Sequence, residues 1–419
     1  MGEKDIGILG GTFNPIHNAH LRVAEYVCSK YNFDKITNRK NTSSYKWDTS
    51  SSNNILPMWV ADMDFEVLPE IKQSIINRAN IGSYGYTFIP EEFYESFRLW
   101  WKKHHDTEIE REWMIYSNGV IATISSIVRR ITKEDDNVLM LTPIYNTFYN
   151  SILNNKRNVV SCDLIYKDGG FAIDFEQLEA LLKDEKTSMM IFCNPHNPIG
   201  KIWAKEDIKR VSFLAKKYNV KLLCDEVHCD IAKPGVKYNP ILSTASELDN
   251  IICCLSAAKT FNISGLQTAC VIVPNEELRK YINRGLNNDE VAEPNFFSMD
   301  AVIAAFKYGD DYVKELNAYI QKNKEYVYDF FKTNLPDIKT IYGEATYLMW
   351  IDFSYMTKNT AKFVKDLETN TGLKLCEGIK YGQAGEGFVR MNVATSFANV
   401  KDACKRIKMF VSKGDRPYE

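Results

Sequence analysis

The sequence predicts an α/β fold with a large, doubly wound, mixed-sheet domain and a smaller α+β domain at its C-terminal end. Short apolar runs at Met189–Cys193, Lys221–Cys224 and Ile251–Leu255 have the length and character of buried parallel strands. Helix-like stretches such as Glu206–Tyr218 precede the second and third of these runs, which is the alternation of a doubly wound sheet. At 419 residues the chain also exceeds what one hydrophobic core usually supports, so we expect two domains.

The other elements are expected from the same patterns. In the large domain these are a helix at Val120–Arg130 and strands at Val138–Leu141 and Val159–Leu164. A long helix at about Asp311–Asn334, ended by Leu335-Pro336, would lead out of that domain. The small domain would contain a strand at Thr346–Phe353, a helix, a strand at Gly387–Val393 and a closing helix. The predicted organisation is a leader at 1–30, an N-terminal arm at 31–75 that belongs to the small domain or a dimer contact, a large domain at 76–312 and a small domain at 313–419.

Composition narrows the class of partner. Lysine and arginine number 52 against 54 acidic residues, a net charge of -2 that gives no reason to expect nucleic acid or an anionic membrane. The ten cysteines follow no disulfide framework, and no apolar stretch reaches the ~18 residues of a membrane span. Cys224, His228 and Cys229 lack the second ligand pair of a zinc site, so no metal is expected. We therefore expect a cytoplasmic enzyme that acts on a small molecule.

Polar residues follow three of the predicted strands, in the segments Asn194–Gly200, Asp225–His228 and Ser256–Phe261. Ligands of open α/β sheets gather at the carboxyl ends of the strands. A lysine, an acid and an amide at these ends suit an aldehyde cofactor on a pyridine ring, since the lysine can form a Schiff base and the carboxylate can keep the ring nitrogen protonated. Taken singly, each feature is ordinary: a surface lysine, a helix cap or a turn.

The order Asn-Pro-x-Asn-Pro-x-Gly, Asp-Glu-x-His and Ser-x-x-Lys-Thr-Phe-Asn resembles fold-type-I pyridoxal-phosphate enzymes, and among them the MalY/PatB cystathionine β-lyase branch of aminotransferase class I/II. The resemblance runs from about Tyr31 to the C-terminus. It includes the segments Trp59–Phe65, Tyr84–Tyr86, Thr142–Tyr145 and Val389–Asn392. It implies an aspartate-aminotransferase-like fold, pyridoxal 5'-phosphate as cofactor in the large domain, and a homodimer with shared active sites.

The same resemblance implies a role for each site residue. Lys259 would carry the cofactor as a Schiff base and transfer protons, Asp225 would pair with the pyridine nitrogen, and Asn197 would pair with the phenolic oxygen. The remaining implied contacts are Tyr145 stacked on the ring, the backbone amides of Val120 and Ile121 and the hydroxyl of Ser256 around the phosphate, Tyr86 on the phosphate and substrate of the neighbouring subunit, and Arg390 on the substrate carboxylate.

Two positions depart from the aminotransferase pattern. His228, also counted among the cofactor-binding residues, stands where aminotransferases usually carry tyrosine, and Gln267 stands where they usually carry a phosphate-binding arginine. Both favour a carbon–sulfur β-lyase that releases a thiol, pyruvate and ammonia from cystathionine or cysteine-like amino acids. An aminotransferase remains the alternative, because the two reactions share their first steps. An added regulatory binding role is a further hypothesis, since the branch includes a member that restrains a transcription factor.

The segment Gly7–His20 resembles the opening of a nicotinate-mononucleotide adenylyltransferase, a family in which two histidines stabilise phosphate charge. Ala19 replaces the glycine of the usual His-x-Gly-His motif, and about thirty residues cannot build a nucleotide-binding sheet. We therefore expect a leader without adenylyltransferase activity.

Overall fold

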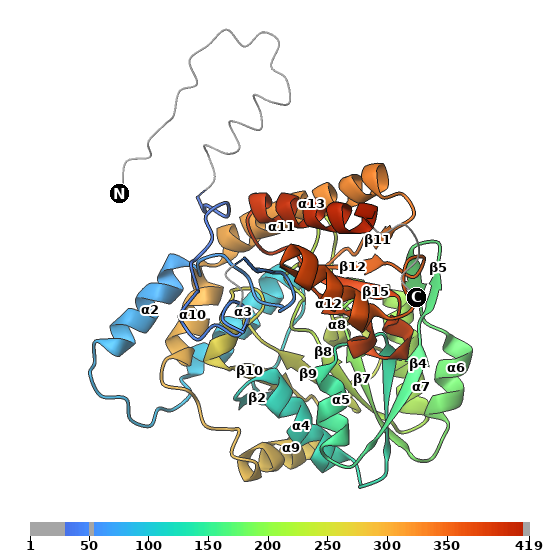
Figure 1. Cartoon of the computed structure of the whole chain (residues 1–419). Helices are drawn as coiled ribbons and strands as arrows, with labels where there is room; N and C mark the ends of the chain where they lie inside the picture. Colours follow the sequence, from blue (N-terminus) through green and yellow to red (C-terminus); the bar gives the residue numbers. More distant parts are fainter. Residues whose placement is uncertain (1–29, 50–53, 414–419) are drawn as a thin grey trace, which may run out of the picture.

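The computed structural model describes residues 30–49 and 54–413, and the motif at Gly7–His20 lies outside them. A seven-stranded sheet and a four-stranded sheet, each packed with helices, form the described part of the chain (Figure 1). The predicted α/β architecture with a mixed sheet is confirmed. Among the described residues, no helix combines the length and the apolar character needed to cross a membrane.

The seven-stranded sheet is parallel except for one strand. Its strands, in spatial order, are β2 (Met114–Ser117), β10 (Ala269–Ile272), β9 (Ile251–Leu255), β8 (Lys221–Asp225), β7 (Thr187–Cys193), β3 (Asn137–Thr142) and β4 (Asn158–Asp163). Strand β10 runs antiparallel to both of its neighbours. The strands β8 and β9 are almost entirely buried, which is why their sequences are nearly continuous apolar runs.

Both faces of this sheet are covered, and side chains alternate between two cores. Along β9, Ile251, Cys253 and Leu255 point into the larger core, whereas Ile252 and Cys254 point into the smaller one. The helices beside the smaller core are α4 (Val120–Ile131), α5 (Thr147–Leu153) and α9 (Glu276–Asn288). The other helices of this region are α2 (Pro69–Ala79), α3 (Glu91–His105), α6 (Phe175–Leu182), α7 (Lys205–Lys217), α8 (Ile241–Thr244) and α10 (Ser298–Tyr308).

The four-stranded sheet is antiparallel and lies at the C-terminal end of the chain. Its order is β11 (Lys339–Ile341), β12 (Leu348–Asp352), β15 (Phe388–Asn392) and β14 (Cys376–Glu377). Its helices are α11 (Asp310–Asn334), α12 (Thr360–Thr371) and α13 (Phe397–Lys413). The remaining short elements are the hairpin β5 (Ile165–Lys167) and β6 (Gly170–Ala172), and the 3₁₀ turns Arg111–Trp113, Ser264–Leu266, Gly378–Tyr381 and Gln383–Gly385.

The N-terminal arm packs on the C-terminal part of the chain. Strand β1 (Leu56–Pro57) pairs in parallel with β13 (Leu373–Lys374). Residues 30–49 contain turns but no helix or strand, and the Lys46 ammonium is buried against Asp64 at 2.9 Å. The backbone amide of Tyr31 donates to Glu315 on α11. The β1–β13 pairing and the contact with Glu315 join this N-terminal segment to the C-terminal part of the chain.

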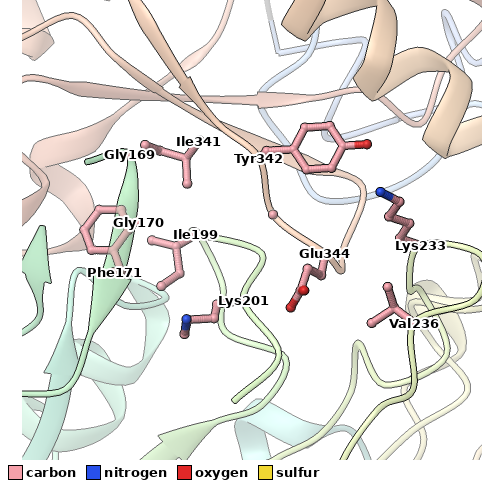
Figure 2. A pocket seen from close by; sticks show the side chains of 11 residues that line it. Gly169, Gly170, Phe171, Ile199, Lys201, Lys233, Val236, Ile341, Tyr342 and Glu344 are labelled. Carbon is pink, nitrogen blue, oxygen red and sulfur yellow. The ribbon is translucent and has the colours of Figure 1, made fainter. Parts of the chain in front are cut away.

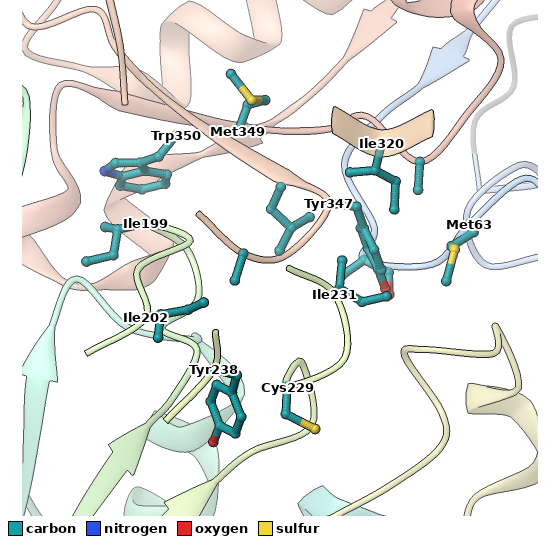
Figure 3. Close-up of a cluster of buried hydrophobic side chains, with 14 of the residues drawn as sticks. Met63, Ile199, Ile202, Cys229, Ile231, Tyr238, Ile320, Tyr347, Met349 and Trp350 are labelled. Carbon is teal, nitrogen blue, oxygen red and sulfur yellow. The ribbon is translucent and has the colours of Figure 1, made fainter. Parts of the chain in front are cut away.

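The two sheets meet through a packed apolar junction (Figure 3). Trp350 of β12 and Tyr347, which directly precedes β12, lie opposite Ile199 and Ile231 from the loops that follow β7 and β8. At this junction two glycines allow close contact between backbone segments. A Cβ added to Gly343 would lie 2.7 Å from the carbonyl oxygen of Ile199. A Cβ added to Gly200, whose φ is +68°, would lie 2.8 Å from the carbonyl oxygen of Ala345. This junction fixes how the loops of the large sheet face the small one.

Candidate active site

The loops after β7, β8 and β9 carry the predicted site. Asn197 follows β7, Asp225 is the last residue of β8, and Lys259 follows β9. These strands are neighbours in the order β9-β8-β7, so their carboxyl ends share one edge of the sheet. Arg390 reaches the same place from β15 of the other sheet, where its Nη1 donates to Oδ1 of Asn197 at 3.1 Å. The predicted lysine, acid, amide and arginine are therefore gathered at one place.

The Lys259 side chain is half-buried and partly uncharged at neutral pH. Its Nζ donates to the carbonyl oxygen of Ala61 at 2.8 Å, and Ser264 Oγ lies 3.5 Å away. Burial lowers the pKa of Lys259 to about 8, while the negative charges of Asp62 and Asp225 oppose this shift. An amine with such a pKa can act as a nucleophile or a base without a strong external base.

Asp225 is a buried carboxyl group with little compensation from the protein. Its Oδ1 accepts one hydrogen bond, from the backbone amide of Val227 at 3.2 Å. Burial raises the pKa of Asp225 to about 6, against the effect of that amide and of Lys259. A cation placed beside the carboxylate would lower this pKa again, so the site favours a positively charged ligand atom.

We call Arg390, Asn197 and His228 the Arg390 cluster. Arg390 is buried, and besides Asn197 it donates through Nη2 to the carbonyl oxygen of Trp59 at 2.8 Å. Its Nε has no hydrogen-bond partner among the described residues, and neither does Nδ1 of His228. The His228 ring packs edge-on against Tyr347 at 5.7 Å, and burial lowers the pKa of His228 to about 3, so the imidazole is neutral at physiological pH. Two buried nitrogens of this cluster, Nε of Arg390 and Nδ1 of His228, thus have no hydrogen-bond partner among the described residues.

The N-terminus of α4 offers backbone donors at the same end of the sheet. The helix begins at Val120 and Ile121 after Gly119, whose φ is +93°, and no side chain caps it. The first amides of a helix lack intrahelical acceptors and attract anions. Gln267 lies beside this turn, with its Cβ 3.7 Å from the position of a Cβ on Gly119. Ser256 is less free than expected, because its hydroxyl donates to the carbonyl oxygen of Thr268 at 2.7 Å and accepts from the amide of Ala258.

Two predicted tyrosines differ in their setting. Tyr145 is half-buried and packs against Phe148 with ring centroids 5.5 Å apart. Tyr86 lies between α2 and α3 and is fully exposed, with a relative accessibility of 103%. Within a single chain, Tyr86 therefore contacts none of the other site residues.

Sequence reasoning missed a second polar cluster directly beside Lys259. We call it the Asp230 cluster: Asp230 Oδ1 accepts from Trp100 Nε1 at 2.9 Å and lies 2.8 Å from His105 Nε2, and its Oδ2 accepts from Thr260 Oγ1 at 2.8 Å. The ligand atoms of His105, Cys229 and Asp230 also lie within 4.8 Å of one another. Since protein donors already occupy both carboxylate oxygens, this geometry describes a hydrogen-bond network that anchors the residue after Lys259.

Tyr347 is the other unpredicted neighbour. Its hydroxyl donates to the carbonyl oxygen of Ala61 at 3.0 Å, the same oxygen that accepts from Lys259. The loop before Tyr347 is held by the buried Lys324, whose Nζ donates to the carbonyl oxygens of Gly343 and Ala345 at 3.0 and 2.7 Å. The one sequence signal for Tyr347 was its position near the start of the predicted strand Thr346–Phe353.

The family described as aminotransferase class I and II matches residues 53–407. The chain belongs to this family. Cystathionine β-lyase PatB of Bacillus subtilis is 35% identical over 91% of this chain and 100% of its own length, which confirms the resemblance to the MalY/PatB branch. The crystal structure of cystalysin from Treponema denticola, which contains a pyridoxal 5'-phosphate cofactor, superimposes with a TM-score of 0.86 at 30% identity and covers 91% of this chain and 99% of that one. The predicted fold-type-I architecture is thereby confirmed.

A second solved structure points the same way. The pyridoxal-phosphate-bound C–S lyase of Staphylococcus hominis is 31% identical, with a TM-score of 0.85, and covers 91% of this chain and 98% of that one. At the N-terminus, the family described as cytidylyltransferase-like matches residues 8–54. That match agrees with the nucleotidyltransferase-like motif, and it continues past residue 30 into the segment expected to be the arm.

The residues present fit pyridoxal phosphate. The uncapped start of α4 suits its phosphate, and the buried Asp225 suits its ring nitrogen. The oxygen of Asn197 is occupied by Arg390, which leaves the amide nitrogen to donate to a phenolic oxygen. Pyridoxal phosphate is therefore the cofactor that the family and its solved structures support for this site.

Proposed function

We propose that the protein is a carbon–sulfur β-lyase that uses pyridoxal phosphate to convert cystathionine or cysteine-like amino acids into a thiol, pyruvate and ammonia. The observation that carries the proposal is Lys259, a half-buried amine with a pKa lowered to about 8, beside Asp225 and Arg390. The choice of lyase over other family activities rests on similarity to PatB and to the C–S lyase of Staphylococcus hominis.

The bound cofactor supplies an electron sink for the charge left when the substrate loses its Cα proton. Lys259 would take that proton, because burial keeps a fraction of its Nζ unprotonated near neutral pH. The electrons left at Cα would then form a Cα=Cβ double bond as the Cβ–S bond breaks and its electron pair leaves with sulfur as a thiolate. Water would convert the remaining three-carbon unit into pyruvate and ammonia. Asp225 would stabilise positive charge on the ring nitrogen, and the free Nε of Arg390 would donate to the substrate carboxylate.

We further propose a homodimer in which Tyr86 completes the partner's site. Tyr86 and Phe88 are 103% and 79% exposed in one chain, and Tyr84 is 58% exposed. Such a run of exposed aromatic side chains is costly in a monomer and typical of an interface. Sedimentation of the holoenzyme would report a dimer, and Tyr86→Ala would lower activity when both subunits carry it.

The lyase proposal is tested by incubating the purified holoenzyme with L-cystathionine and measuring pyruvate. We expect pyruvate release in the wild type and loss of both the activity and the visible absorbance of the lysine-linked cofactor in Lys259→Ala. Lys209→Ala, an exposed lysine on α7, is the matched control and should behave as wild type. Pyruvate release that survives Lys259→Ala would contradict the assignment.

An aminotransferase is the second candidate, favoured by the description of the family. Such an enzyme would convert a 2-oxo acid into an amino acid at the expense of the amino donor, without net pyruvate and ammonia from cystathionine. Measuring both products in one substrate panel separates the two activities. For the N-terminal segment we propose no adenylyltransferase activity, so pyrophosphate release from ATP and nicotinate mononucleotide should stay at the level of the blank.

A further inference from the structure

A cavity of about 330 Å³ opens at the junction of the two sheets, separate from Lys259 and Arg390 (Figure 2). Four segments that are far apart in sequence line it: the β5–β6 hairpin, the loops after β7 and β8, and the β11–β12 connection. Its volume lies in the range of small-molecule sites, and such sites are frequent where structural layers meet. A ligand here would touch the loops that follow β7 and β8 and the connection between β11 and β12.

The floor of the cavity is apolar. Phe171, Ile199 and Ile341 line it and are 5%, 2% and 5% exposed. Backbone at Gly169, Gly170 and Gly343 contributes no side chain to the lining, which keeps the space open. A compact hydrocarbon group would be buried on this floor.

The rim carries three charged side chains: Lys201, Lys233 and Glu344. In the part of the chain that the structure describes, none of the three forms an ion pair with another residue. The two ammonium groups instead lie near aromatic rings, Lys201 5.5 Å from Trp203 and Lys233 5.1 Å from Tyr342. Figure 2 shows the Glu344 side chain between the two lysines in that view. The rim therefore offers cations and an anion around one apolar floor.

We propose that this cavity is a second small-molecule site that binds a free α-amino acid with an apolar side chain. The carboxylate of such a ligand pairs with Lys201, its ammonium group pairs with Glu344, and its side chain covers Phe171 and Ile199. A simple organic anion would meet the carboxylate of Glu344 as a like charge, and a simple amine would meet the two lysines. A zwitterion offers an opposite charge to a rim lysine and to Glu344 at once.

The site would act on the catalytic loops through the backbone. Ile199 lies two residues after Asn197, and the amide of Ala345 donates to the carbonyl oxygen of Gly200 at 2.8 Å. A ligand on Ile199 and Glu344 would therefore tighten the contact between the loop that carries Asn197 and the loop that precedes Tyr347. It is distinct from the substrate site, which contains Arg390.

The test is isothermal titration calorimetry on the holoenzyme after treatment with aminooxyacetate, which caps the cofactor carbonyl so that amino acids cannot react there. L-leucine is the probe. Two comparison ligands keep its hydrocarbon and one of its two charges: 4-methylpentanoate keeps the carboxylate, and 3-methylbutylamine keeps the ammonium group. We expect L-leucine to bind at least about tenfold more tightly than either comparison ligand, because each of them lacks one charged contact.

Variants locate the binding. Lys201→Gln and Glu344→Gln should each weaken L-leucine binding about tenfold, whereas Lys209→Gln on α7 and Arg390→Lys in the active site should leave it unchanged. Absence of L-leucine binding, binding that ignores both rim variants, or equal affinity for 4-methylpentanoate would each overturn the proposal. Because the measurement needs the cofactor but not turnover, it is independent of the lyase assay.

Discussion

The Asp230 cluster and the Arg390 cluster both lie beside Lys259, and they differ in how completely their hydrogen bonds are made. Both oxygens of Asp230 are occupied by protein donors from α3 and from Thr260. In the Arg390 cluster, Nε of Arg390 and Nδ1 of His228 are buried and have no partner among the described residues. One cluster is complete as the chain folds, and the other is not.

This difference distinguishes residues that hold the fold from residues that are available to a ligand within one site. A buried polar network whose members are all satisfied rigidifies the fold, whereas a buried donor without an acceptor costs free energy unless a ligand supplies the acceptor. The Asp230 cluster therefore positions the turn that carries Lys259. Under the proposed function, the unpartnered nitrogens of the Arg390 cluster would meet polar atoms of cofactor and substrate. Three substitutions test this distinction, and a fourth tests the buried Lys324, which lies outside both clusters.

The largest effect is expected for Asp230→Ala. The substitution leaves three buried donors of Trp100, His105 and Thr260 without their acceptor, so the free energy of unfolding should fall by about 3–5 kcal/mol. Urea unfolding of the apoprotein measures it. Asp249→Ala removes an exposed carboxylate and should change stability by less than about 1 kcal/mol. Equal losses in the two variants would mean that the Asp230 cluster does not stabilise the fold.

Arg390→Lys should act mainly on activity. A lysine keeps the charge but loses the planar set of donors that can hold Asn197, Trp59 and a substrate carboxylate together, so kcat/KM should fall by about 10- to 100-fold, chiefly through KM. Steady-state kinetics with cystathionine measure the change. Arg111→Lys, at a partly exposed ion pair, is the control. An unchanged KM would argue against a contact between Arg390 and substrate.

Lys324→Met tests a buried cation of the junction. Burial lowers the pKa of Lys324 to about 7 from 10.5, so the unfolded chain binds more protons than the folded one between these values. The wild type should gain stability as pH rises through that window, by about 1 kcal/mol between pH 7 and 8, and Lys324→Met should lack this gain. Unfolding curves at pH 6.5, 7, 8 and 9 measure the difference between the two proteins. Parallel pH profiles would show that Lys324 keeps an ordinary pKa.

The smallest effect on stability is expected for His228→Phe. Because Nδ1 of His228 has no hydrogen-bond partner within residues 30–49 and 54–413, an aromatic ring without nitrogen should change the stability of the apoprotein by no more than about 1 kcal/mol. Cofactor affinity, measured by absorbance titration, should fall. A large loss of apoprotein stability with unchanged cofactor affinity would instead mean that His228 has a structural role, like the residues of the Asp230 cluster.

Much of the large sheet could be predicted from the sequence because buried strands read as apolar runs. The bounds of β9 agree with the prediction at both ends, and those of β7 and β8 differ by at most two residues. The run around Cys270 is apolar and strand-like, but no sequence pattern reveals that β10 (Ala269–Ile272) runs antiparallel between β2 and β9. Pairing direction is decided by the packing of the whole sheet.

The same limit explains which site residues could be predicted. Asn197, Asp225 and Lys259 follow strands whose carboxyl ends must share an edge, so strand order alone brings them together. The Asp230 cluster joins residues 125 and 130 positions apart, and the Tyr347 hydroxyl meets Ala61 across 286 positions. Such contacts depend on how α3 and β12 pack, which no local pattern encodes. The roles assigned to the site residues stay predictions until the substitutions are made.

The contact between Gly200 and Gly343 has a consequence for how the gene can change. Every single-nucleotide substitution that replaces a glycine either adds a Cβ or ends the chain, and a Cβ at either position would press on a backbone carbonyl that cannot move aside. Substitutions that replace either glycine should therefore be eliminated by selection, whereas the charged residues on the rim of the neighbouring cavity can be replaced without this clash. Lineages of this protein could alter what the cavity binds without altering how the two sheets meet.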